Sequence, residues 1–294
     1  MATRPRAGER RAHPRAKRRF SQNFLVDTNM ARKICDLCAV GSGDTVLEIG
    51  PGTGALTRHL VERAGHVHAV EVDRELSARL RVEFADTQNL SLHERNILKA
   101  RVADLVSGGP VTVVGNLPYN ITSDLVLWLL DQHRDVRRAV ILMQREVARR
   151  LTAGPGEREA GSLTLALQYR CEADRLLDVP PTCFRPVPKV HSSLVALRFR
   201  GKPAVTPRDE RLFFRVIRAA FGERRKTLVN ALTGGLHLPR STAAAAVAEA
   251  GLPPLVRGER LSLEDFRRLA DALGAAPEGP PGNEPSKGPP GYQE

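Results

Sequence analysis

The chain has 294 residues, of which 41% are hydrophobic and 27% are charged. This length fits one large domain or two smaller ones, and the composition excludes a wholly disordered or fibrous protein. Lysine and arginine number 45 against 33 aspartate and glutamate, a net charge of +12, which favours nucleic acid or an acidic membrane surface as partner. Aromatic residues make up only 4%, so a broad platform for stacking bases is excluded.

The N-terminal segment 1–19 carries eight basic residues and one acidic residue, which accounts for +7 of the net charge. Pro5, Gly8 and Pro14 prevent a continuous helix there. We expect a disordered basic arm, which is either simply solvated or also contacts the phosphates of a nucleic acid. At the other end, residues 276–294 are rich in proline and glycine, and we expect a disordered tail without function.

The cysteines and apolar runs indicate the compartment. Four cysteines in a chain of this length do not form a disulfide scaffold, and the N-terminus does not resemble a secretory signal. Apolar runs such as Leu125 to Leu130 are far shorter than the ~20 residues of a membrane-spanning helix. We therefore expect a soluble cytoplasmic protein without membrane contact. Cys35 and Cys38 have the spacing of a zinc or redox pair, but they fall late in a predicted helix over 28–39, where a buried apolar face is the better interpretation. We expect no metal site.

Strands and helices then alternate along the chain. Apolar runs bounded by turns predict strands at 45–49, 67–72, 90–92, 111–114, 136–143, 173–179 and 191–199, and helices at 56–63, 75–84 and 124–130. Such alternation is typical of an α/β protein with a mainly parallel, seven-stranded, Rossmann-like sheet. From residue 207 onward the pattern is helical only, with helices expected at 208–221, 224–232, 240–250 and 262–273. We expect a catalytic domain over 20–205 and a smaller all-helical domain over 206–275.

A glycine-rich loop follows the first strand of this pattern. Glycines at a strand-to-helix turn let a ligand approach the main chain closely. Glu71 ends the next strand, 21 residues after Gly50, where its carboxylate can accept hydrogen bonds from ribose hydroxyls. Gly50, Gly52 and Ala55 fit a dinucleotide-binding pattern, whereas Glu48, Gly50 and Gly52 fit that of S-adenosylmethionine enzymes. The loop alone leaves both alternatives open.

A second motif, Gly115-Asn116-Leu117-Pro118-Tyr119-Asn120, favours the second alternative. It follows the strand over 111–114, whose carboxyl end should lie beside the cofactor crevice. The Asn116 side-chain oxygen and a nearby carbonyl can accept both protons of an exocyclic amine, Pro118 fixes the chain, and Tyr119 can stack on a base. A nicotinamide-dependent oxidoreductase, the rival interpretation, has no use for this set.

Asn116-Leu117-Pro118-Tyr119 is similar to the signature of amino-group methyltransferases, and residues 20–273 resemble the ribosomal RNA adenine dimethyltransferase family. The resemblance is carried by segments 20–25, 48–54, 144–148 and 183–190. It implies transfer of methyl groups from S-adenosyl-L-methionine to adenosine in rRNA. Within the family, Ala220 to Leu228 resembles the branch that dimethylates two adjacent adenosines near the 3′ end of small-subunit rRNA, which we favour. The alternatives are the Erm-type branch, which methylates a large-subunit adenosine and confers macrolide resistance, and a non-catalytic RNA-binding assembly factor.

The resemblance also implies roles for residues of this sequence. The expected cofactor-binding residues are Gln22, Asn23, Leu25, Glu48, Gly50, Gly52, Gly54, Glu71, Asn96 and Asn116. The expected catalytic residues are Asn116, Leu117, Pro118, Tyr119 and Phe184. Two roles are open for Phe184, which would either stack on the second face of the base or lie in the core beneath the loop at Pro186 to Pro188. Asn96 stands where the family usually has aspartate, and its side-chain oxygen can accept the same bond from the adenine amine.

Basic residues of the helical region complete the expected site. Between residues 200 and 226 there are nine lysines and arginines against three acidic residues. We expect Lys189, Arg224, Arg225 and Lys226 to bind RNA phosphates. The partner is then rRNA, in a small-subunit particle, and we expect the protein to be a monomer.

Overall fold

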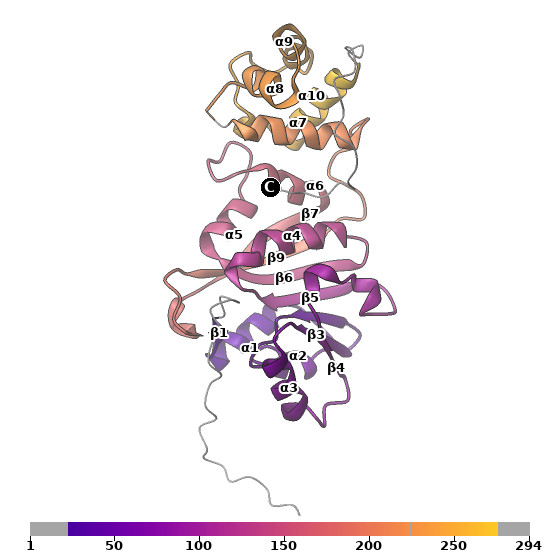
Figure 1. Ribbon diagram of the computed structural model, residues 1–294, viewed down its shortest axis with the longest axis vertical. Helices are drawn as coiled ribbons and strands as arrows, with labels where there is room; N and C mark the ends of the chain where they lie inside the picture. The colour runs from indigo at the N-terminus through magenta and orange to yellow at the C-terminus, as the bar shows by residue number, and fades with distance from the viewer. Residues whose placement is uncertain (1–22, 224, 276–294) are drawn as a thin grey trace, which may run out of the picture.

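The structure is a computed structural model that describes residues 23–223 and 225–275 (Figure 1). The expected basic arm and tail, together with Gln22 and Arg224, lie outside the described residues. None of the described helices is long and apolar enough to cross a membrane.

A seven-stranded sheet forms the centre of the larger part of the molecule (Figure 1). Its strands are β2 (Thr45–Ile49), β3 (His66–Glu71), β4 (Leu90–Glu94), β5 (Val111–Asn116), β6 (Val136–Gln144), β7 (Cys171–Val179) and β9 (Ser192–Phe199). The strand order is β4-β3-β2-β5-β6-β9-β7. The first five strands of this order are parallel, whereas β9 is antiparallel to both β6 and β7. A separate two-stranded ribbon pairs β1 (Phe24–Leu25) with β8 (Phe184–Arg185).

Helices cover both faces of the sheet, because successive residues of a buried strand point to opposite faces. Val46 faces one core together with α1 (Thr28–Leu37) and α2 (Thr57–Val61), and Leu47 faces the other with α4 (Thr122–Asp131) and α6 (Ser162–Arg170). The remaining helices of this part are α3 (Arg74–Glu83) and α5 (Arg145–Leu151), with the short turns η2 (Ile97–Lys99), η3 (Val102–Asp104), η4 (Tyr119–Ile121) and η5 (Pro181–Cys183).

Four further helices form one end of the molecule, at the top of Figure 1. They are α7 (Glu210–Gly222), α8 (Leu228–Leu236), α9 (Arg240–Glu249) and α10 (Leu263–Ala275), with η6 (Gly258–Arg260) between the last two. Their core also contains Leu165 and Tyr169 of α6. The Tyr169 hydroxyl donates to Glu210 at 3.0 Å, and Arg170 pairs with the same carboxylate at 2.6 Å. The packing of the helical end therefore begins at α6, although the expected domain boundary follows β9.

The structure confirms the expected sheet and corrects several elements. All seven predicted strands are present, with ends shifted by one or two residues. The stretch before the sixth strand holds α5 and α6, which the sequence pattern did not predict, and β1 and β8 were also missed. The helix expected from residue 224 begins at Leu228. Before it, the Lys226 amide donates to the Glu223 carbonyl at 2.9 Å in a turn, and Thr227 has an extended backbone.

Candidate active site

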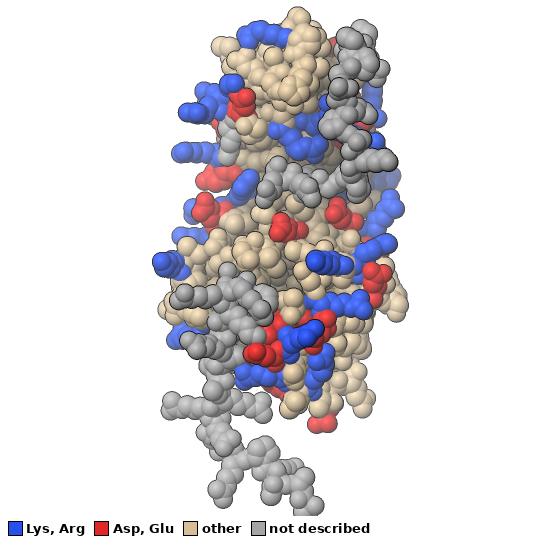
Figure 2. Space-filling model, viewed as in Figure 1, with Lys and Arg blue, Asp and Glu red and all other residues tan. Residues whose placement is uncertain are grey.

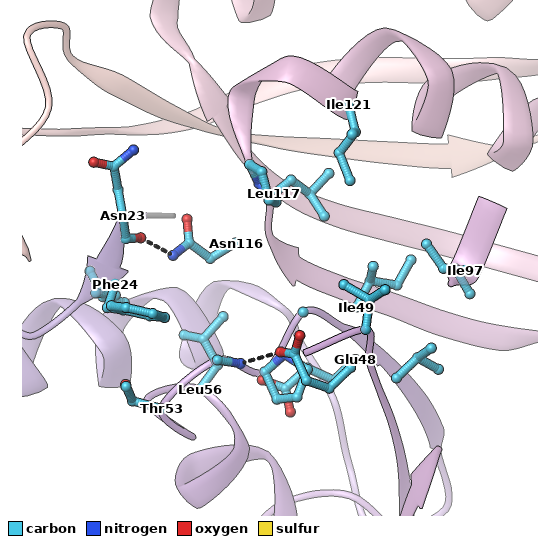
Figure 3. A pocket seen from close by; sticks show the side chains of 18 of the residues that line it. Asn23, Phe24, Glu48, Ile49, Thr53, Leu56, Ile97, Asn116, Leu117 and Ile121 are labelled. Atoms are coloured by element: carbon cyan, nitrogen blue, oxygen red, sulfur yellow. Dashed lines mark hydrogen bonds between the residues drawn. The ribbon is translucent and has the colours of Figure 1, made fainter. Parts of the chain in front are cut away.

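A cavity of about 300 Å³ opens where the sheet order reverses, beside the carboxyl ends of β2 and β5. This is the position where ligands bind in open α/β sheets. Its wall contains most of the expected cofactor residues and several that were not expected. It is lined by Asn23, Phe24, Leu25, Glu48, Ile49, Gly50, Pro51, Gly52, Thr53, Ala55, Leu56, Val70, Glu71, Val72, Arg95, Asn96, Ile97, Leu98, Asn116, Leu117, Pro118, Asn120 and Ile121. Figure 3 shows how the labelled members surround it.

The glycine-rich loop after β2 forms one wall of the cavity. Gly50 and Gly52 have φ angles of +66° and +59°, which residues with a Cβ rarely adopt. A Cβ on Gly52 would also lie 3.2 Å from the Phe24 ring. Gly54, expected to bind the cofactor, does not line the cavity. A Cβ there would lie 2.9 Å from the ring of Phe84 at the end of α3, so this glycine serves packing against α3.

Arg58 holds this loop from outside the cavity. Its guanidinium donates to the Gly54 carbonyl at 3.0 Å and to the Thr53 carbonyl at 3.2 Å, and it also pairs with Glu83 of α3. These bonds fix the carbonyls on the far side of the loop. Sequence reasoning missed Arg58, although a residue four positions after Gly54 in a helix can reach back to that carbonyl.

Glu48 is a carboxylate buried in the cavity wall, only 1% exposed. Its Oε2 atom has no hydrogen-bond partner among the described residues. Burial raises the pKa of Glu48 from 4.5 to about 8, and the charge of nearby Glu71 adds to the rise. The side chain points toward the cavity in Figure 3. A buried carboxylate oxygen without a donor is costly, so Oε2 of Glu48 suits a ligand group that donates a hydrogen bond or carries a positive charge.

Glu71 ends β3 at the same edge of the sheet. Its Oε2 accepts from the Gly52 amide at 3.1 Å and its Oε1 from the Asp73 amide at 2.9 Å. Burial raises its pKa, and the two amide bonds oppose that rise. Because each carboxylate oxygen can accept a second bond, Glu71 both fixes the glycine loop and retains capacity for ligand hydroxyls.

Asn96, at the exposed end of β4, caps the short turn that follows. Its Oδ1 accepts from the Leu98 amide at 3.0 Å. An amide oxygen has two lone pairs, so one stays available for a second donor, and the role of Asn96 toward a ligand amine stays a prediction. Arg95, Ile97 and Leu98 line the same part of the cavity and were not predicted.

Asn116 ends β5 on the opposite wall. Its Nδ2 donates to the Asn23 carbonyl at 3.1 Å, the bond drawn in Figure 3. This bond fixes the orientation of the amide and leaves Oδ1 as an acceptor. Asn23 thus positions Asn116 from a segment 93 residues away in sequence. Leu117 and Pro118 also line the cavity, as expected.

The two aromatic residues expected to stack on a base lie in different environments. Tyr119 is half-buried beside the cavity, and its hydroxyl bonds Ser192 Oγ at 2.9 Å. Phe184 is 1% exposed and packs in the core with Leu25, its partner across the β1–β8 ribbon. In this arrangement Phe184 offers no face to a base and is a core residue, which is the second of the two roles considered for it.

The expected RNA-binding residues are dispersed. Lys189 is exposed in the loop between β8 and β9, and Arg225 and Lys226 are exposed in the turn before α8, where Lys226 pairs with Glu223. Figure 2 shows Lys and Arg over both the sheet part and the helical end of this face, with Asp and Glu among them. The assignment of these residues to RNA binding stays a prediction.

The cysteine pair agrees with the interpretation as a packed helix face. Cys35 and Cys38 are fully buried at the end of α1. Burial raises the pKa of both thiols, that of Cys38 to about 12. Neither thiol is therefore poised to react as a thiolate.

Together, a glycine loop after the first parallel strand, acidic side chains on two neighbouring strands and an Asn-Leu-Pro-Tyr turn define a methyltransferase of the Rossmann-like class. Solved structures agree with this class. The chain is similar to the 23S rRNA methyltransferase ErmE (28% identical, TM-score 0.69, covering 86% of this chain and 100% of that one). It is also similar to a dimethyladenosine transferase from Plasmodium falciparum (25% identical, TM-score 0.72, covering 84% and 95%).

Sequence comparison identifies the family. The model of the family "Ribosomal RNA adenine dimethylase" matches residues 13–273. A protein of Aromatoleum aromaticum described as ribosomal RNA small subunit methyltransferase A is 45% identical over 261 residues, covering 89% of this chain and 95% of its own. One of Bacillus mycoides with the same description is 42% identical, covering 87% and 91%. The chain belongs to the ribosomal RNA adenine dimethylase family and is an rRNA adenine dimethyltransferase. This membership disagrees with the oxidoreductase and the non-catalytic alternatives.

Proposed function

We propose that this enzyme uses S-adenosyl-L-methionine to dimethylate two adjacent adenosines near the 3′ end of small-subunit rRNA, within an assembling particle in the cytoplasm. The observation that carries the proposal is the pairing of a donor wall, with two buried carboxylates, and an acceptor wall, with an oriented Asn116 oxygen, across one cavity. The relatives described as small-subunit methyltransferases are 42–45% identical, whereas ErmE is 28% identical. These identities favour the small-subunit target over the Erm-type one.

The donor wall fits S-adenosylmethionine, which supplies an activated methyl group on a positively charged sulfur. The unpartnered Glu48 oxygen would meet the cationic methionine portion, Glu71 the ribose hydroxyls and the Asn96 oxygen the adenine amine. Gly50 and Gly52 leave the main chain open to close approach. Each of these residues thus offers chemistry complementary to one part of the cofactor.

On the acceptor wall, Asn116 would prepare the target nitrogen. The lone pair of an adenosine amine is delocalised into the purine ring, which makes it a poor nucleophile. An amide oxygen that accepts an N–H bond favours a more tetrahedral nitrogen with its lone pair free. A second acceptor, a main-chain carbonyl near Pro118, would accept a hydrogen bond from the other N–H of the amine. Catalysis is then positioning by preorganised dipoles, and it requires no residue with a tuned pKa.

Tyr119 would stack on the target base once that base has left its own stack. Its hydroxyl is held by Ser192, which restricts the ring to one orientation. Stacking of a base on an aromatic ring contributes about 1–3 kcal/mol, and this offsets part of the cost of unstacking an adenosine. Phe184 could contribute a second face only if its core packing opened.

The test is methyl transfer from labelled S-adenosylmethionine to unmethylated small-subunit particles and, in parallel, to naked large-subunit rRNA, with the modified bases mapped. We expect label on two neighbouring adenosines near the 3′ end of small-subunit rRNA. Label confined to a large-subunit adenosine would replace this target with the Erm-type one. Cofactor binding without label on either RNA would contradict the proposed reaction.

A further inference from the structure

Between β8 and β9 the chain exposes apolar side chains on a short loop, residues 186–190, which we call the valine tip. Val187 is 53% exposed and Val190 42% exposed. Single exposed apolar residues are ordinary on protein surfaces, but contiguous ones mark interaction sites. Of the five large apolar side chains exposed in the described part of the chain, these two alone share one loop.

Both ends of the valine tip are tied to the active site. On one side β8 pairs with β1, whose Phe24 and Leu25 line the cavity. On the other side Ser192 holds the Tyr119 hydroxyl at 2.9 Å. In Figure 1 the loop lies beside β1 at the edge of the sheet part. The valine tip therefore stands next to the acceptor wall.

The composition of the tip suits an insertion element. Pro186 and Pro188 flank Val187 and fix two φ angles, so the apolar side chain is presented at a low cost in conformational entropy. Segment 179–191 contains Arg185, Lys189 and His191 and no acidic residue. Lys189 makes no ion pair with the described residues. Apolar side chains between cations match a polyanion with stacked apolar bases, which is the chemistry of RNA.

We propose that the valine tip is a wedge that enters the base stack of the substrate RNA next to the target adenosine. Proteins that unstack nucleic acid insert apolar side chains between bases, and the inserted side chain replaces contacts that the departing base loses. Val187 would fill the gap in the stack while Lys189 contacts a neighbouring phosphate. This inference rests on the proposed function, because it takes RNA adenosine as the substrate.

The experiment places 2-aminopurine at the target position of a hairpin with the 3′-terminal small-subunit rRNA sequence and follows its fluorescence on adding the full-length enzyme. Wild-type enzyme should raise the fluorescence as the base leaves the stack. V187S should reduce both the fluorescence increase and the rate of methylation of small-subunit particles about tenfold. The affinity of V187S for the RNA should change less than threefold. V187I should show the wild-type fluorescence increase and the wild-type methylation rate, because isoleucine is also an apolar wedge.

Matched controls are V82S on α3 and L255S before η6, two apolar residues that are each 80% exposed away from the cavity. Both should behave as wild type. An unchanged fluorescence rise with V187S would overturn the wedge. The wedge would also be overturned if V187S lost binding to particles but bound the hairpin normally, because that result indicates that Val187 contacts a protein of the particle. Failure of the proposed function is seen separately, as absence of label from wild-type enzyme. A fluorescence rise that depends on Val187 would support the wedge even then.

Discussion

The donor wall and the acceptor wall of the cavity differ in charge and in burial, although they are formed by neighbouring strands. Glu48 and Asn116 belong to β2 and β5, which pair in parallel with Glu48 opposite Val114. The donor wall, formed by β2 and its neighbour β3, carries the buried carboxylates Glu48 and Glu71. The β5 wall is neutral and half-buried and borders the exposed valine tip. A buried acid suits a small cationic donor that can be enclosed. A neutral, open wall suits one base of a large polyanion, which a buried carboxylate would repel.

The largest effect is expected when the Asn116 side-chain amide is removed from the acceptor wall. N116A should lower kcat about 100- to 1000-fold, because a preorganised dipole at the reacting group is lost. Binding of S-adenosylmethionine, measured by calorimetry, should change less than threefold. N29A on the exposed start of α1 is the matched control and should keep full activity. Normal methylation by N116A would show that the acceptor wall has been misplaced.

The donor wall is tested by E48Q through pH. Because the pKa of Glu48 is raised from 4.5 to about 8, the folded protein retains a proton that the unfolded chain releases between these pH values. Its stabilising contribution is present below pH 4.5 and is lost as the pH rises through 8. E48Q avoids this loss. We therefore expect the free energy of unfolding of E48Q, measured by thermal unfolding, to exceed that of wild type by about 1–3 kcal/mol at pH 9 and to match it near pH 4.5.

The same substitution should weaken cofactor binding. The affinity of wild type for S-adenosylmethionine should rise with pH toward about 8, as Glu48 ionises, whereas that of E48Q should be nearly independent of pH. E62Q, at an exposed position after α2, is the control. Identical pH profiles for wild type and E48Q would remove Glu48 from the donor contacts.

A smaller effect is expected from R58M. Without the guanidinium, the carbonyls of Thr53 and Gly54 lose their donor, and the glycine loop loses its fixed shape. The Kd for S-adenosylmethionine should rise about tenfold, which corresponds to one charged hydrogen bond. The kcat at saturating donor should hardly change. R81M, which removes an exposed pair with Glu94 on the same sheet edge, should leave the Kd unaltered.

The smallest effect concerns RNA. Lys226 is already paired with Glu223, whereas Arg225 makes no ion pair with another described residue. R225Q should therefore weaken RNA binding about two- to threefold and reduce the salt slope by about 0.7–0.9, the contribution of one phosphate contact. K226Q should change both less. Filter binding at several salt concentrations decides this, and equal slopes for all three proteins would exclude a phosphate contact in this turn.

The fold was predictable where apolar periodicity is strong. The strands β2, β5 and β6 at the centre of the sheet are mostly buried, largely apolar runs, and each was predicted from that pattern. Helix α6 was missed because its apolar residues face both the sheet core and the helical end, which removes the one-sided period of an amphipathic helix. The ribbon of β1 and β8 has two residues in each strand and joins segments about 160 residues apart, so no local pattern marks it.

The site was predictable where glycine, acid and motif positions fix the chemistry. Gly50, Gly52, Glu71, Asn96 and Asn116 all line the cavity as expected. What the sequence could not provide are relations across the fold: the bond from Asn116 to Asn23, the hydrogen bonds from Arg58 to the loop, and the choice between the two roles of Phe184. Each depends on which segments meet in space, and a motif carries no information on that.

The contribution of α6 to the helical core limits how the enzyme can be recombined. Leu165 and Tyr169 fill the space between α7 and its neighbours, and Glu210 binds both Tyr169 and Arg170. A chimera that joins this sheet part to the helices of another family member at residue 205 would therefore place foreign side chains against Tyr169. The unit that can be exchanged without disturbing this packing is therefore the helical end together with α6.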